Sequence, residues 1–112
     1  MIDGSPGETT VVRLCRLDEI DDGGMARFEL DGFNLAVIRI EDKVYGLEDR
    51  CSHQNVPLST GEVDTDECLV VCTKHGAAFD VETGEALILP ATRPVPTYDL
   101  AVEDGEVLLV LS

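Results

Sequence analysis

The sequence contains no long run of apolar residues. The longest uninterrupted stretches in the 112-residue chain, Cys68–Cys72 and Val107–Leu111, have five residues each. A helix that crosses a membrane needs about 20 such residues, and the opening MIDGSPGETT is not a signal peptide. We therefore expect a soluble, cytoplasmic protein with no membrane partner.

Basic residues are also scarce. Eight lysines and arginines stand against 23 aspartates and glutamates, so the net charge is −15 at pH 7. This charge makes nucleic acid and anionic membranes poor partners. The acidity has two compatible interpretations: a surface that keeps the protein soluble, and long-range attraction toward a basic face of a partner protein.

No window of the sequence shows a sustained helical repeat, and short strand-like runs take its place. Met25–Leu30 and Tyr98–Glu103 alternate apolar and polar residues. Leu35–Ile38 and Val107–Leu111 are continuously apolar and predict central strands covered on both sides. Asp31-Gly32 between two such runs predicts a hairpin. We expect an all-β fold, a sandwich or a barrel, with further turns at Asp22-Gly23-Gly24, Glu41-Asp42, Thr83-Gly84 and Asp104-Gly105.

The length of the chain predicts one domain, residues 1–112, with a flexible N-terminus at residues 1–10. From about residue 47 to residue 83, loops interrupt the strand pattern. We expect this segment to form a small metal-binding subdomain inserted in the all-β base. The proline-rich stretch Leu89–Tyr98 follows it and predicts a stiff connector. The connector is either a plain return loop or a loop that shields the metal site.

Both histidines of the chain lie beside cysteines: Cys51 with His53, and Cys72 with His75. Two such pairs on separate loops can converge on one site that offers two thiolates and two imidazoles. This set suits a tetrahedral zinc ion, or a [2Fe–2S] cluster with two cysteines on one iron and two histidines on the other. The remaining alternative is two core histidines and two buried thiols. Nothing in the sequence points to the oxidising compartment that disulfides need.

The distribution of the ligands favours iron. A finger-type zinc site offers its histidines three to five residues apart after a pair of cysteines. Here each loop supplies one cysteine and one histidine. This suits a unit of two irons in which each loop spans both irons.

The segments CSHQNVPLSTGEV and CTKHGAAFDVETGEAL closely resemble the two cluster-binding loops of Rieske-type ferredoxins, including those of bacterial ring-hydroxylating oxygenase systems. The resemblance extends over nearly the whole chain. It implies the Rieske fold, an antiparallel β-sandwich or barrel base with an inserted cluster-binding subdomain. It also implies one [2Fe–2S] cluster, with Cys51 and Cys72 on one iron and His53 and His75 on the other. Thr73 departs from the family, which often has proline there.

Other positions distinguish this chain from the Rieske proteins of respiratory complexes. Those proteins carry a membrane anchor and an extra pair of cysteines, where this chain has Val56 and Lys74. They also carry a serine and a tyrosine that donate hydrogen bonds to the cluster, where this chain has Ala77 and Phe79. The resemblance therefore implies a potential toward the low end of the Rieske range of about −150 to +300 mV.

The two cysteines outside the pairs, Cys15 and Cys68, have no matching role in the family, and we expect each to be a small core hydrophobe. The chain has no further histidines for the mononuclear iron of an oxygenase. It also lacks a Gly-rich dinucleotide fingerprint. We therefore expect an electron-transfer component that is not itself an enzyme.

The implied function is that of a monomeric one-electron carrier between a flavoprotein reductase and a terminal oxygenase or other redox enzyme. Two alternatives remain open: an accessory Rieske subunit in iron–sulfur assembly or nitrite reduction, and a zinc-stabilised Cys₂His₂ interaction module. In the family, electrons leave through the histidine ligands. The expected docking patch around them has little charge and comprises Gln54, Asn55, Val56, Pro57, Leu58 and Lys74.

Overall fold

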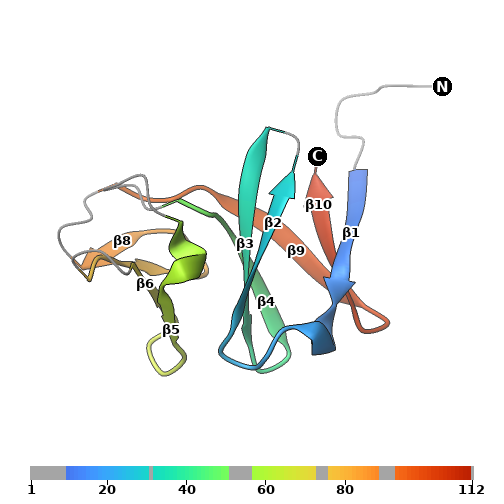
Figure 1. The fold of residues 1–112 in the computed structure, drawn as a ribbon, viewed down its shortest axis with the longest axis horizontal. Coiled ribbons are helices and arrows are strands. Elements are labelled where there is room, and N and C mark those ends of the chain that lie inside the picture. Colours follow the sequence, from blue (N-terminus) through green and yellow to red (C-terminus); the bar gives the residue numbers. More distant parts are fainter. Residues whose placement is uncertain (1–9, 31, 51–56, 73–75, 89–92, 112) are drawn as a thin grey trace.

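The computed structural model describes residues 10–30, 32–50, 57–72, 76–88 and 93–111. The expected flexible N-terminus lies outside these ranges, except for Thr10, which begins the first strand. Two antiparallel sheets lie side by side along the long axis of the molecule (Figure 1). In chain order the elements are β1 (Thr10–Arg16), the 3₁₀ helix η1 (Leu17–Glu19), β2 (Met25–Leu30), β3 (Phe33–Ile40), β4 (Lys43–Glu48), the 3₁₀ helix η2 (Leu58–Thr60), β5 (Glu62–Asp64), β6 (Leu69–Val71), β7 (Ala78–Asp80), β8 (Ala86–Ile88), β9 (Thr97–Glu103) and β10 (Glu106–Leu111).

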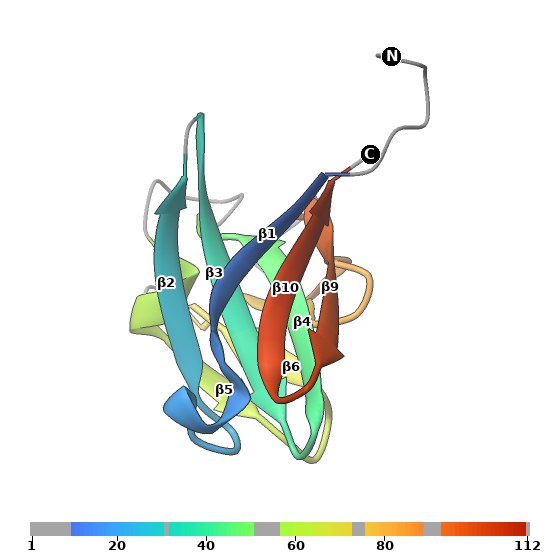
Figure 2. The same cartoon turned by 90° about the vertical axis from the view of Figure 1, so that its right-hand side faces the viewer.

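The larger sheet has six strands in the order β1-β10-β9-β4-β3-β2, and it curls strongly (Figure 2). The smaller sheet has four strands in the order β5-β6-β7-β8. Its strands come between β4 and β9 in the sequence, and β8 extends the sheet beyond residue 83, where we expected the inserted segment to end. The prediction of an all-β fold is confirmed. No helix in the described ranges has the length and apolarity needed to cross a membrane.

The predicted hairpin at Asp31-Gly32 is confirmed by the pairing of Leu30 with Phe33 across these two residues. Gly32 has a φ angle of +94°, which side chains disfavour and glycine adopts freely. Turns also occur at each of the other predicted positions, between β2 and η1, between β3 and β4, after β7 and between β9 and β10.

The two continuous apolar runs behave differently. Leu35–Ile38 in β3 is fully buried, as predicted. In β10 only Val107 and Leu109 are fully buried, while the residues between and after them are half-buried. The prediction that Val107–Leu111 is covered on both sides is therefore wrong. This strand has neighbours on both edges, but only one of its faces packs into a core.

The strands enclose two apolar cores. One lies within the curl of the larger sheet and contains Leu35 and Val37 of β3 together with buried residues of β10. The other contains Ile38 of β3 and Leu47 of β4, and buried residues of the smaller sheet such as Phe79. Opposite faces of β3 therefore supply different cores, which explains why its apolar run has no polar interruption.

The proline-rich segment returns the chain to β9 along the smaller sheet. Val95 is buried in the core that the two sheets share, and its backbone N–H donates to the carbonyl oxygen of Gly84 over 2.8 Å. The carbonyl oxygen of Pro96 accepts a hydrogen bond from Glu48 of β4. Residues 89–92 lie outside the described ranges, so whether the segment shields the metal site stays untested.

Candidate metal centre

Cys72 is the one predicted ligand that the structure describes. Cys51, His53 and His75 lie outside the described residues, as do Val56 and Lys74. Among the residues that are described, no three or more cysteine, histidine, aspartate or glutamate side chains are grouped so that they could hold a metal ion. The ligand set of two cysteines and two histidines therefore stays a prediction, and the structure shows what surrounds it.

Cys72 directly follows β6 and is almost fully buried, with 2% of its surface exposed. Its backbone N–H donates to the carbonyl oxygen of Ala77 over 2.7 Å, which closes the connection between β6 and β7. Gly76 in this connection has a φ of +70°, and a Cβ atom added there would meet no atom of the described residues within 4 Å. Cys72 thus begins the connection between two paired strands, and a backbone hydrogen bond joins the two described ends of that connection.

The described residues that follow the first Cys/His pair pack on the same core. Leu58, at the start of η2, is fully buried and belongs to the apolar cluster that also contains Cys72, Ala77 and Phe79. The flanks of both loops therefore converge on one apolar base. The expectation that Leu58 lies in an exposed docking patch is wrong, because this side chain anchors η2 in the core.

Ala77 and Phe79 are both completely buried beside Cys72. Neither side chain carries a polar group, so neither offers a hydroxyl to a group held at the loops. Cys15 and Cys68 are only half-buried and pack at the edges of the two cores. They have the expected apolar surroundings, although neither is a fully buried core residue.

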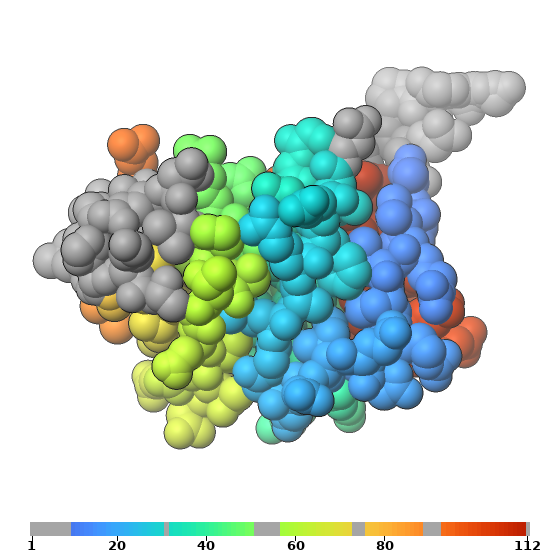
Figure 3. Space-filling model, viewed as in Figure 1, coloured from blue at the N-terminus to red at the C-terminus, as the bar shows by residue number. Residues whose placement is uncertain are grey.

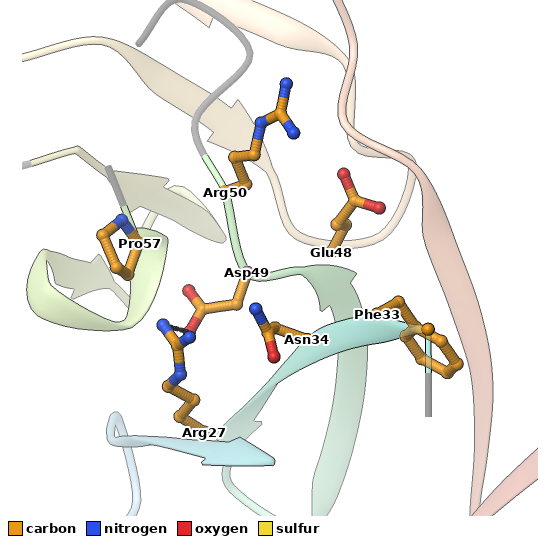
Figure 4. Close-up of a pocket in the computed structure, with 8 residues that line it drawn as sticks. Arg27, Phe33, Asn34, Glu48, Asp49, Arg50 and Pro57 are labelled. Atoms are coloured by element: carbon orange, nitrogen blue, oxygen red, sulfur yellow. Dashed lines mark hydrogen bonds and ion pairs between the residues drawn. The ribbon is translucent and has the colours of Figure 1, made fainter. Parts of the chain in front are cut away.

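Asp49 was missed by sequence reasoning. It is the one polar or charged residue that is buried within the described part of the chain, with 3% of its surface exposed. Its Oδ1 accepts a hydrogen bond from the backbone N–H of Ser59 over 2.7 Å. Its Oδ2 accepts a hydrogen bond from the Ser59 hydroxyl at 2.6 Å. It also accepts one from Arg27 Nη1 at 3.2 Å, which Figure 4 shows. Acidic residues are common in this sequence, so only its burial distinguishes Asp49 from the others.

A hollow of about 390 Å³ opens beside these groups. Figure 4 shows Arg27, Asn34 and Asp49 around it, with Arg50 and Pro57 at the two ends of the segment that carries Cys51 and His53. The space-filling view shows η2 against the β2–β3 hairpin on this face (Figure 3). The first loop therefore begins and ends next to the larger sheet.

The described residues fit a Rieske cluster. Such a cluster needs thiolate and imidazole ligands from two loops held against an apolar base. Cys72 offers a buried thiol at the end of one such loop, and the cores behind both loops are apolar. Cys51, His53, Cys72 and His75 would hold the cluster, which supplies one-electron chemistry when bound.

Comparison with known proteins also supports a Rieske [2Fe-2S] cluster. The family model of the Rieske [2Fe-2S] domain matches residues 10–99. The ferredoxin subunit of 3-phenylpropionate/cinnamic acid dioxygenase from Photorhabdus laumondii is 36% identical over 99 residues, which cover 88% of this chain and 92% of that protein.

Solved structures agree in fold. The ferredoxin of carbazole 1,9a-dioxygenase from Nocardioides aromaticivorans IC177 matches with a TM-score of 0.86 and 35% identity, over 89% of this chain and 96% of that one. A chain in a complex of reduced oxygenase and oxidized ferredoxin in carbazole 1,9a-dioxygenase matches with a TM-score of 0.83 and 33% identity, over 88% and 91%. This chain therefore belongs to the Rieske [2Fe-2S] family, and it is a one-electron carrier with a single Rieske-type cluster.

Proposed function

We propose that this protein carries electrons from a flavoprotein reductase to the terminal oxygenase of a dioxygenase system, and that it does so as a cytoplasmic monomer. The observation that carries the proposal is the match to a dioxygenase ferredoxin subunit over 92% of that subunit's length. The solved complex of a related ferredoxin with its oxygenase supports an oxygenase as the acceptor.

The proposed ligands are Cys51, His53, Cys72 and His75, on the inserted segment that we assign as the cluster-binding subdomain. Two observations support this assignment. The described ends of both loops pack on one apolar core, and the Cys72–Ala77 hydrogen bond holds the second loop closed. Cys72 is itself almost fully buried and belongs to the same apolar cluster as Phe79 and Val95.

The chain has no means of performing the oxygenation itself. Oxygenation by this class of enzyme uses a mononuclear iron held by two histidines and a carboxylate. The sequence contains only two histidines, and both are assigned to the cluster. The protein therefore supplies electrons and leaves substrate chemistry to its acceptor.

The first test is the composition of the purified protein. We expect two irons and two acid-labile sulfides per chain, a red-brown colour, and a Rieske-type EPR signal after reduction. Replacing His53 or His75 with alanine should abolish that signal. A colourless protein that contains zinc and no sulfide would leave the interaction module as the correct function.

The second test is reconstitution with partners. We expect the protein to restore substrate oxidation when it is added to a flavoprotein reductase and a dioxygenase that lack their own ferredoxin. A cluster-loaded protein that fails here but supports nitrite reduction or cluster assembly would exclude the dioxygenase role while it preserves the electron-carrier role.

A further inference from the structure

We propose that Asp49 is a positioning residue for the Rieske cluster: its buried carboxylate fastens the two ends of the first ligand loop to each other and to the larger sheet. The proposal rests on the assignment of Cys51 and His53 as ligands. It concerns residues that the structure describes, since Asp49 and Ser59 flank the loop and Arg27 lies in β2.

The first step is the place of Asp49 in the chain. It directly follows β4 and precedes Cys51 by two residues. Ser59 lies in η2, ten residues further along, so the hydrogen bonds between them close the segment that contains both predicted ligands. A loop whose ends are held together has fewer conformations, which favours the one that binds the cluster.

The second step is the attachment of this closure to the base. The backbone N–H of Asp49 donates to the carbonyl oxygen of Asn34 in β3 over 2.9 Å. Its carboxylate accepts from Arg27 in β2. Asp49 is therefore held by two strands of the larger sheet. Its hydrogen bonds with Ser59 fix the position of η2 relative to these strands.

The third step is the energetic asymmetry of a buried charge. The Asp49 side chain has no exposed surface, whereas the Arg27 side chain is 33% exposed and can reach water. An ionised carboxylate without solvent depends on its donors, and removing one of them leaves the charge poorly compensated. The three donors therefore act as one unit, and loss of any should loosen the loop.

The test compares isosteric variants for cluster retention. In Asp49→Asn, an amide group replaces the charge and turns a donor toward Arg27 and the Ser59 hydroxyl. We expect the reduced variant to show a broadened EPR signal. We also expect its cluster to be lost to a chelator about tenfold faster than that of the unaltered protein, which is the low end of the effect on metal affinity when a group that orients a ligand is removed. Ser59→Ala keeps the backbone N–H donor and should show a smaller acceleration of the same kind.

Glu106→Gln is the matched control. It removes the carboxylate that pairs with Arg13 between β1 and β10, where no predicted ligand lies nearby in the sequence. Its rate of cluster loss and its EPR signal should equal those of the unaltered protein. If Asp49→Asn does not fold, the comparison of Ser59→Ala with Glu106→Gln decides the proposal.

Urea unfolding of the cluster-loaded proteins, followed by far-ultraviolet circular dichroism, separates positioning from plain stability. Positioning requires that the acceleration of cluster loss exceed what the change in unfolding midpoint explains. Cluster loss and EPR signals that match the unaltered protein, or that follow the midpoint alone, would overturn the proposal and leave the carrier function intact. An unaltered protein that never holds a cluster would instead overturn the carrier function.

Discussion

The backbone N–H of Cys72 points at the carbonyl oxygen of Ala77 over 2.7 Å, across the connection between β6 and β7. This bond brings a predicted cluster ligand next to a side chain that lacks a hydroxyl. Phe79, two residues further along, is buried in the same apolar cluster. Of the described residues in this cluster, Ala77 and Phe79 offer no side-chain donor, and adding a hydroxyl at either position should change the potential of the cluster.

We predict that Ala77→Ser and Phe79→Tyr each raise the midpoint potential. A hydrogen bond to a charged acceptor is worth about 1.5–3 kcal/mol, and about 1.4 kcal/mol corresponds to roughly 59 mV for one electron. We therefore expect an increase on the order of 60–130 mV, measured by voltammetry. Ala78→Ser buries the same hydroxyl at the next residue and is the control. Equal potentials in all three variants would show that neither hydroxyl reaches the cluster.

Gly61 and Gly76 should differ in what a methyl group costs. A Cβ atom on Gly61 would lie 1.9 Å from the carbonyl oxygen of Val71, so β6 must move. At Gly76 no described residue lies within 4 Å of an added Cβ atom, so among the described residues only the φ of +70° opposes a side chain. We expect Gly61→Ala to lower the free energy of unfolding by about 1–3 kcal/mol or more, and Gly76→Ala by about 1–2 kcal/mol. Urea unfolding measures both, and the reverse order would contradict the geometry.

Substitutions of Leu58 and Val56 should change different properties: stability for Leu58, and electron transfer for Val56. Leu58→Ala leaves a cavity under η2 and should cost about 2–5 kcal/mol of stability, with faster cluster loss. Val56→Asp, at the predicted docking patch, should slow electron transfer to the acceptor without changing the spectrum. Val11→Asp is the control, because Val11 lies on β1 and is 54% exposed. Stopped-flow reduction of the acceptor gives the rates, and equal rates for Val56→Asp and Val11→Asp would place the docking face elsewhere.

Salt should slow electron transfer through the association rate. Charges that attract a partner are screened beyond about 8–10 Å at physiological ionic strength. Asp66→Lys should slow association further if the acidic turn after β5 faces the partner, whereas Glu103→Lys on β9 serves as a control of equal charge. Asp64 is less suitable, because its Oδ1 accepts hydrogen bonds from the backbone N–H groups of Asp66 and Glu67. Association rates that do not depend on salt would exclude steering by charge.

Stability should fall at alkaline pH. Burial raises the pKa of the Cys15 thiol above its ordinary value of 9.0. The pKa of the Tyr45 hydroxyl is raised above its ordinary value of 10.0, mainly by burial and to a smaller extent by the negative charge of Glu82. The folded state therefore holds these protons more tightly than the unfolded state. Stability from them is complete below pH 9 and is lost as the pH rises through the raised values. Urea midpoints from pH 8 to 11 measure this loss, and Tyr45→Phe should reduce it.

The sequence was sufficient for features that depend on neighbouring residues. The Asp31-Gly32 turn follows from the backbone freedom of glycine, and the burial of Leu35–Ile38 follows from an apolar run between two turns. The candidate ligands were visible because cysteine and histidine are rare in this chain and lie at short spacings.

Features that depend on distant residues were not predictable in this way. Leu58 was assigned to the docking patch because it follows His53 closely in the sequence, but it belongs to an apolar cluster with residues from β6 and β7. Asp49 is one of 23 acidic residues, and its distinction comes from Arg27 and Ser59, which lie 22 and 10 residues away. The half-exposed face of Val107–Leu111 likewise depends on how the sheet curls, and no local pattern encodes that curl.

Because the two faces of β3 pack into different cores, the two sheets are coupled in unfolding. The core beneath the ligand loops is completed by Ile38 and Leu47, which belong to strands of the larger sheet. The smaller sheet thus supplies only part of the apolar core that keeps it folded. Unfolding of β3 would remove the contribution of Ile38 to that core. We infer that β5–β8 cannot open as a separate cooperative unit while the base stays intact at full stability. A graft of the cluster loops onto another scaffold would have to bring β3 and β4 with it.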